Sequence, residues 1–348
     1  MAEEEVVMRV QSKIGSLHTR EVYERFRKAG ASFLVLSILT NGVPLYFLNL
    51  DIPKFPRGRE NNKTALAQSS FVSETLVEWE SKGFVRRIKL EEAKVILPLS
   101  VADRWSHSKQ VLKYRLVLDC SPLTSNLSYG KIKLPDLTFL RNQIRRGDFI
   151  GLIDISECES EWCKDILMIV VFAASFYLHF TLQEDYSDRL CFMWDFGDGK
   201  GPVYFRAVVM LFGIPHAPWV VTQVTDVLVN FFKKTHQICI NPFIDDFSHV
   251  CHDVLEEAMK QFEFARKEIR KWGFVVSEGK IVMPAKKNVI LGFEVDTEAM
   301  VIRFDEAKWS ELRFLVEDAL QERVQARYLA KIIGKFFRQV FLFCVSED

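Results

Sequence analysis

The sequence predicts an α+β protein with antiparallel strands, and three stretches support this fold class. Residues 238–250, ICINPFIDDFSHV, place β-type apolar residues on both sides of two adjacent aspartates, which is typical of a tight hairpin. Residues 149–155, FIGLIDI, form a short apolar run that indicates a buried strand. Residues 255–272 carry apolar side chains at helical spacing before Gly273, so they predict a long amphipathic helix.

The remaining elements follow from the same apolar periodicities and from Gly and Pro at their ends. An N-terminal extension, residues 1–60, ends in a linker rich in Pro and Arg. Further helices are predicted at 71–84, 135–145, 219–233, 311–321 and 326–337, and further strands at 94–101, 114–118, 190–194, 203–209, 275–283 and 288–296. The glycine-rich loop 196–202 lacks the spacing of a phosphate-binding loop and is interpreted as a turn.

Charge is distributed unevenly along the 348 residues, although 46 basic and 46 acidic side chains cancel overall. Residues 81–150 hold fourteen Lys and Arg against six Asp and Glu, whereas residues 151–198 hold ten acids against two bases. A basic stretch followed by an acidic one fits a phosphate-binding surface beside a metal site. Two oppositely charged solvated faces are the alternative interpretation.

The chain also has the composition of an intracellular protein, cytoplasmic or nuclear. Its seven cysteines form no disulfide framework, its start does not resemble a signal peptide, and its longest apolar run is too short to span a membrane. His249, Cys251 and His252 match no common zinc spacing, and we interpret them as part of a loop after the hairpin.

Three aspartates are the candidate catalytic and metal-binding residues. Asp245 and Asp246 lie at the hairpin tip, and Asp154 ends the buried strand, where a charge is unusual. Crowded carboxylates raise one another's pKa unless a cation holds them, and Mg²⁺ is a natural partner. Together they would hold two Mg²⁺ (or Mn²⁺) ions about 4 Å apart, with the backbone carbonyl of Ile155 completing a shell. An ordinary solvated turn is the alternative for the Asp pair.

Basic residues near these aspartates are candidates for binding a nucleoside triphosphate. Arg115 would contact the phosphates as a forked donor, and Lys113 and Lys109 lie near it in the sequence. Lys280 is a candidate proton donor to a leaving pyrophosphate. For each lysine a solvated surface position is the alternative.

The order of the motifs FIGLIDIS, LFGIPHAP, FIDDF, WGFVVSEGK and ILGFEVD resembles that of retrotransposon reverse transcriptases, of a DIRS/Ty3-like lineage. The resemblance covers roughly residues 40 to 340 and implies a right-hand fold. It assigns 61–148 to the first part of the fingers, 149–305 to the palm with a second fingers segment at 182–209, and 306–348 to the start of a thumb.

By resemblance, the activity is RNA-directed DNA synthesis from deoxynucleoside triphosphates on an RNA template with a DNA or RNA primer. Phe212 and Gly213 would line the nucleotide site, and Leu291 and Gly292 would belong to the primer grip. A ribonuclease H segment is expected in the parent polyprotein, and the chain ends where a connection to it would begin.

One departure from the family pattern is large. The family has an aromatic residue five positions after the strand aspartate; here Tyr177 reaches that place only when the eighteen residues 157–174 are removed. We interpret 157–174 as an in-frame retained intron or its scar, which would leave the protein folded with impaired or absent activity. Thr124 replaces a frequent Asn, and Pro242 requires an edge strand or a first strand position.

Two other functions fit parts of the pattern. A non-catalytic, reverse-transcriptase-like module or decayed fragment would bind nucleic acid as a scaffold. An unrelated metal-dependent phosphotransferase would use the same carboxylates, but it would not explain the basic stretch at 81–150.

Overall fold

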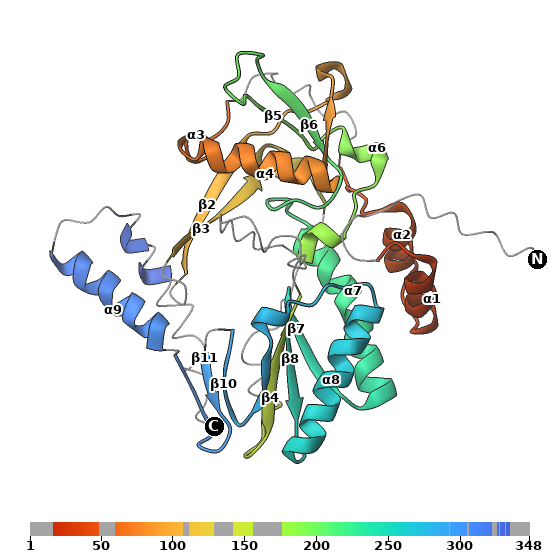
Figure 1. Ribbon diagram of the computed structural model, residues 1–348, viewed down its shortest axis with the longest axis vertical. Helices are drawn as coiled ribbons and strands as arrows, with labels where there is room; N and C mark the ends of the chain where they lie inside the picture. Colours follow the sequence, from red (N-terminus) through yellow and green to blue (C-terminus); the bar gives the residue numbers. More distant parts are fainter. Residues whose placement is uncertain are drawn as a thin grey trace, which may run out of the picture. The chain divides into compact units, whose positions relative to one another are not determined.

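The computed structural model describes residues 17–48, 60–106, 111–128, 142–155, 176–291, 293–304, 306–321, 326, 328–330 and 332–334. It confirms a mixed α and β protein with antiparallel sheets (Figure 1). Most of the predicted helix 135–145, the segment 157–174, Lys109 and Gly292 lie outside the described residues.

The chain divides into two compact units, which we describe separately. The first comprises Met1–Lys133, Asp154–Gln237 and Phe264–Lys280; the second comprises Leu134–Ile153, Ile238–Glu263 and Ile281–Asp348.

Among the residues that the structure describes, the first unit contains two antiparallel sheets and most of the helices. One sheet has the strand order β1-β6-β5, and the other is the pair β2-β3. The strands are β1 (Val85–Ile88), β2 (Leu99–Ser106), β3 (Val111–Leu118), β5 (Cys191–Trp194) and β6 (Val203–Ala207). The helices are α1 (Arg20–Lys28), α2 (Phe33–Asn41), α3 (Lys63–Ala67), α4 (Ser69–Lys82), α6 (Glu184–Ser187) and α7 (Ala217–Phe231), which continues as a π-helical turn, Phe232–His236.

Helix α4 shows how the local sequence sets the ends of an element. It buries Val72, Leu76 and Trp79 together with Thr75 on one side, while Val77 is exposed. Gly83 then ends the helix with φ 75°, a left-handed conformation that glycine adopts without steric cost.

The second unit is built on the sheet β7-β8-β4-β9 and the sheet β10-β11-β12. Ile150, Val250, Ile290, Phe293 and Val295 form one buried apolar cluster within this unit. Its strands are β4 (Phe149–Asp154), β7 (Cys239–Phe243), β8 (Asp246–Cys251), β9 (Val282–Ala285), β10 (Lys287–Ile290), β11 (Phe293–Asp296) and β12 (Val301–Phe304), followed by helix α9 (Glu306–Gln321).

Helix α8 (Leu255–Lys271) follows β8 and continues from the second unit into the first. Phe262 of this helix packs against β4 at Gly151, where an added Cβ would lie 2.7 Å from the Phe262 ring. Glycine at this position therefore lets the helix approach the sheet closely.

Several strand predictions were wrong in their extent. The predicted strand 94–101 begins only at Leu99, because Pro98 has no N–H to donate to a ladder. Residues 275–283 are interrupted by a 3₁₀ turn, Glu278–Lys280, before β9. The run 288–296 is two strands that meet at Leu291, whose φ of 52° turns the chain back on itself.

The interpretation of His249 and Cys251 as loop residues was also wrong. Both belong to β8 and are buried, because this strand lies inside the four-stranded sheet. Among the described residues, no helix is long and apolar enough to cross a membrane.

Candidate functional site

The Asp245–Asp246 pair lies at the tip of an antiparallel hairpin, as the sequence predicts. Strands β7 and β8 pair from Cys239↔Val250 to Phe243↔Asp246, which leaves Ile244 and Asp245 as the two turn residues. Pro242 lies in β7, which is an edge strand of its sheet, so its missing N–H breaks no ladder.

The backbone at this tip is strained. Ile244 has φ 59°, and a β-branched residue with positive φ is an outlier that costs about 1–3 kcal/mol. Glycine or asparagine would form the same turn at lower cost. Strain of this kind is found most often at functional sites, where the surrounding structure holds it in place.

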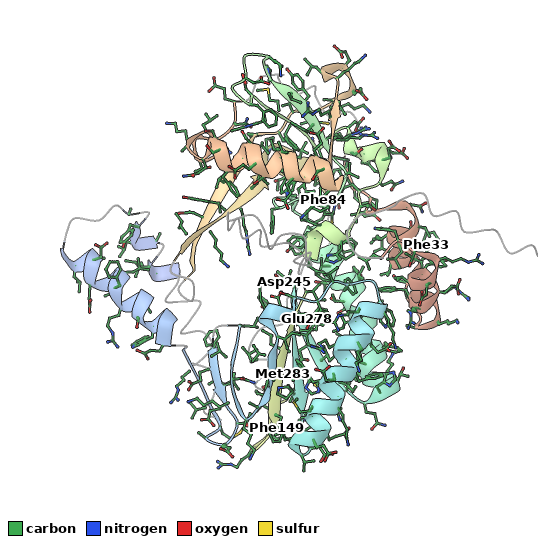
Figure 2. The ribbon with its side chains drawn as sticks, in the orientation of Figure 1. Phe33, Phe84, Phe149, Asp245, Glu278 and Met283 are labelled. Carbon is green, nitrogen blue, oxygen red and sulfur yellow. The ribbon has the colours of Figure 1, made fainter. Side chains whose placement is uncertain are left out.

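Asp154 is the last residue of β4, which lies between β8 and β9 in the four-stranded sheet. Figure 2 shows Phe149, the first residue of β4, at the end of the sheet opposite Asp245. The strand therefore runs toward the end of the sheet that carries the hairpin tip.

The Asp154 side chain is 10% exposed and its carboxylate is paired with Lys280. The Lys280 Nζ lies 3.2 and 3.4 Å from the two carboxylate oxygens. The Asp154 carbonyl accepts a 2.9 Å hydrogen bond from the Ser277 N–H, and Ile155 bridges Val276 antiparallel. Two candidate residues 126 positions apart in the sequence are thus in direct contact.

The meeting of Asp154 with the hairpin aspartates on a shared metal ion stays a prediction. Within the part of the chain that the structure describes, no group of three or more His, Cys, Asp or Glu side chains is arranged to hold a metal ion.

Three candidate nucleotide-binding residues from separate segments lie together in the first unit. The Arg115 guanidinium lies over the Phe212 ring, 5.2 Å from its centroid. The Tyr177 ring packs edge-on against the same Phe212 ring, with 5.8 Å between the two centroids and an interplanar angle of 84°. Contacts of both kinds are favourable and directional.

Gly213 is required by the approach of this loop to β3. Its φ is 97°, and an added Cβ would lie 1.9 Å from the Leu118 carbonyl oxygen. The Leu118 N–H in turn donates a 2.8 Å hydrogen bond to the Phe212 carbonyl. The loop 212–213 is therefore seated on the end of the strand that carries Arg115.

The other predicted residues are only partly placed. Lys113 lies two residues before Arg115 in β3, so their side chains leave the same face of the strand. Leu291 is the turn residue between β10 and β11, and its role in a primer grip stays a prediction. Lys109 and Gly292 lie outside the described residues.

Two titratable groups close to this loop and strand in the sequence, His216 and Cys120, are neutral at physiological pH. Burial lowers the pKa of His216, three residues after Gly213, to about 4. Burial raises the pKa of the Cys120 thiol far above its usual range, so Cys120 is a packing residue and not a nucleophile.

Asn61 and Asn62 are site-supporting residues that sequence reasoning did not assign. The Asn62 amide donates to Ser100 Oγ at 2.6 Å and to Asp119 Oδ2 at 3.0 Å. The Asn61 amide donates to the Met193 carbonyl, and its oxygen accepts from the Leu99 N–H. Asn62 stands at the N-cap position of α3 but its side chain makes no cap hydrogen bond there, so the usual N-cap signal does not identify this role.

No protein-family model matches this chain, and no curated protein matches it either.

Proposed function

We propose that the chain is an RNA-directed DNA polymerase domain of a retroelement. The observation that carries this proposal is the meeting of Arg115, Tyr177 and Phe212, which come from three segments of the first unit. A cation stacked on an aromatic ring beside a second ring suits a ligand that has both phosphates and a sugar and base.

In this proposal Arg115 binds the triphosphate as a forked donor. Tyr177 and Phe212 form an apolar surface for the incoming nucleotide, and Gly213 keeps that surface against β3. Lys113, on the same face as Arg115, adds positive charge beside the phosphates.

The carboxylates Asp154, Asp245 and Asp246 are the residues that would hold magnesium, since they offer the hard oxygen ligands that this ion prefers. The chemistry supplied by bound magnesium is activation of a primer 3′-hydroxyl and neutralisation of the leaving pyrophosphate. The Lys280 ammonium, which holds Asp154 in place, is proposed to protonate the pyrophosphate.

The proposed fold is a polymerase right hand. The sheet β7-β8-β4-β9 fits a palm, because it is antiparallel at β7-β8 and at β4-β9 and carries the two hairpin aspartates at the β7-β8 turn. The sheets of the first unit fit fingers, and α9 fits the start of a thumb.

Primer extension tests the proposal. The full chain, a DNA primer on an RNA template, deoxynucleoside triphosphates and Mg²⁺ should yield extended primer. We expect Asp245→Asn to reduce extension at least about a hundredfold, the loss typical of removing charge stabilisation at the reacting group. Asp185→Asn, at an exposed carboxylate in α6, is the matched control and should extend as the parent does.

Extension by Asp245→Asn at the rate of the parent would remove the metal-site assignment. A further variant that lacks residues 157–174 tests the retained-intron interpretation, and we expect it to extend faster than the full chain. Sequencing the transcripts provides the second check: messages that mostly keep these codons contradict the interpretation.

A second candidate function is a non-catalytic module that binds nucleic acid. The Asp154–Lys280 ion pair favours it, because a lysine held against the carboxylate competes with a metal ion for the same oxygens. Binding of primer–template without extension, both in the full chain and in the form lacking 157–174, would support this candidate over the polymerase.

A further inference from the structure

We propose that the N-terminal segment 18–43, which contains α1 and α2, acts as a clamp on residues 176–183, hereafter the Tyr177 segment, and that His18 is the central positioning residue of this clamp. Only the role of Tyr177 in binding the nucleotide rests on the proposed function. The contacts themselves lie within the first unit.

The backbone after α2 binds the Tyr177 segment directly. The Val43 N–H donates to the Thr181 carbonyl at 2.7 Å, and the Val43 carbonyl accepts from the Gln183 N–H at 2.9 Å. At Gly42, which has φ 88°, an added Cβ would lie 2.8 Å from backbone atoms of Leu182 and Gln183. The two backbones are therefore too close for any side chain at position 42.

His18 adds a side-chain link between the helices and the same segment. Its Nδ1 lies 2.9 Å from the Leu39 carbonyl oxygen, which can only accept, so Nδ1 carries the proton. Its Nε2 is then the acceptor for the Thr181 hydroxyl at 3.1 Å and, at 3.5 Å, for the Thr181 N–H. His18 is 6% exposed and Thr181 is fully buried, so water does not replace these bonds readily.

His179 continues the connection toward Asp154. Its Nδ1 lies 3.2 Å from the Phe176 carbonyl, and its Nε2 accepts from the Val275 N–H at 3.3 Å. The next residue, Val276, bridges Ile155, directly after Asp154. The 3₁₀ turn that contains Tyr177, Phe176–His179, is thus held by the imidazole of its last residue, His179, and by Thr181, two residues after it.

The clamp therefore fixes the backbone of the turn that contains Tyr177, and Phe212 contacts the Tyr177 ring. A shift of about 1 Å in a group that orients a reacting ligand can reduce the rate about a hundredfold. The part of the N-terminal extension that the structure describes is, on this argument, part of the nucleotide site's support.

Fluorotyrosine at position 177 of the full chain tests the clamp without any assumption about activity. The ¹⁹F chemical shift and line width report the surroundings of this ring. We expect His18→Phe, which keeps the ring shape and removes both nitrogens, to shift or broaden the signal. An unchanged signal in a folded His18→Phe protein would overturn the proposal.

Two smaller substitutions separate the two bonds of His18. Gln reaches the position of Nε2 and can still accept from Thr181, whereas Asn reaches only the position of Nδ1. We expect His18→Gln to keep the parent signal and His18→Asn to resemble His18→Phe. Thr181→Val should resemble His18→Phe, and the double variant should add little further change, because both single variants remove the His18–Thr181 hydrogen bond.

His249→Phe is the matched control, since it replaces a buried histidine of the other unit. It should leave the fluorine signal unchanged; an effect equal to that of His18→Phe would mean that general destabilisation, and not the clamp, moves Tyr177.

Primer extension then links the clamp to the proposed function. We expect His18→Phe to raise the KM for deoxynucleotides about fivefold, the equivalent of one hydrogen bond, with a smaller change in kcat. A fluorine response in variants of a protein that extends no primer, with or without residues 157–174, would support the clamp and contradict the polymerase proposal. Extension with an unaltered KM in His18→Phe would overturn the link between clamp and nucleotide.

Discussion

Gly213 is required for two reasons, and comparison with a second glycine, Gly30, separates them. Its φ of 97° is unfavourable for any L side chain, and its Cβ position is occupied by the Leu118 carbonyl oxygen. Gly30 has the first constraint alone, since its φ is 81° and nothing lies within 4 Å of its Cβ position.

We expect Gly213→Ala to lower the free energy of unfolding by roughly 3 kcal/mol or more, because backbone strain and a clash add, and Gly30→Ala to lower it by only about 1 kcal/mol. Urea denaturation of the two variants and the parent measures both losses. Equal losses would mean that the loop 212–213 lies farther from β3 than described.

Ile244 adopts a backbone conformation, φ 59°, that isoleucine disfavours. Its positive φ lowers the stability of the folded protein. An asparagine at the same position would lower it less, since Asn is tolerated in this conformation. We expect Ile244→Asn to raise the free energy of unfolding by about 1 kcal/mol. Denaturation in urea checks this, and a loss of stability would show that packing of the isoleucine side chain outweighs the strain.

At the scale of elements, the sequence predicts what is local. The apolar spacing of 255–272 and the glycine at position 83 predict α8 and the end of α4 because helix periodicity and capping act within a few residues. The hairpin is predicted for the same reason. The division of 288–296 into two strands was missed although Gly292 stands between them in the sequence, because the leucine before it is not a usual turn residue and the apolar run continues on both sides.

The candidate site shows the same limit over longer distances. The motif order identified Arg115 and Phe212 separately, and their contact follows only from the fold. Tyr177 emerged when residues 157–174 were set aside. His18 was not identified, because its partner Thr181 lies 163 positions away and a single histidine in an N-terminal extension has no local pattern.

Thr297 joins three elements of the second unit. Its hydroxyl lies 2.7 Å from the Asp148 carbonyl, just before β4, and 3.0 Å from the Lys286 carbonyl, between β9 and β10. Thr297 is fully buried, so a valine of similar shape would take the hydroxyl donor away from the Asp148 carbonyl, while the Lys286 carbonyl would keep the Thr297 N–H at 2.9 Å.

We expect Thr297→Val to lower the free energy of unfolding by about 1–3 kcal/mol. Thr222→Val is the matched control: the Thr222 hydroxyl donates to the Pro218 carbonyl of its own helix and is only half-buried, so its loss should cost less. Thermal or urea unfolding distinguishes the two, and equal small losses would argue against a joining role for Thr297.

At the scale of the whole molecule, both units bury imidazoles that are neutral at physiological pH. Burial lowers the pKa of His179, His216 and His249 to about 4 each, with the hydrogen bond to the Phe176 carbonyl opposing this in part at His179. In the unfolded chain a histidine has a pKa near 6.5. Between about pH 6.5 and pH 4 the unfolded chain therefore binds more protons than the folded protein, and stability falls as the pH falls.

Each such histidine should remove on the order of 1 kcal/mol of stability per pH unit within that window. We expect His249→Phe, which retains a ring in the core and removes one titrating group, to flatten the dependence of the free energy of unfolding on pH by about that amount. Urea denaturation from about pH 7.5 to about pH 5 measures the slope for the variant and the parent. Identical slopes would mean that His249 is protonated equally in the folded and unfolded states. That result would contradict the prediction that burial within β8 lowers the pKa of this imidazole.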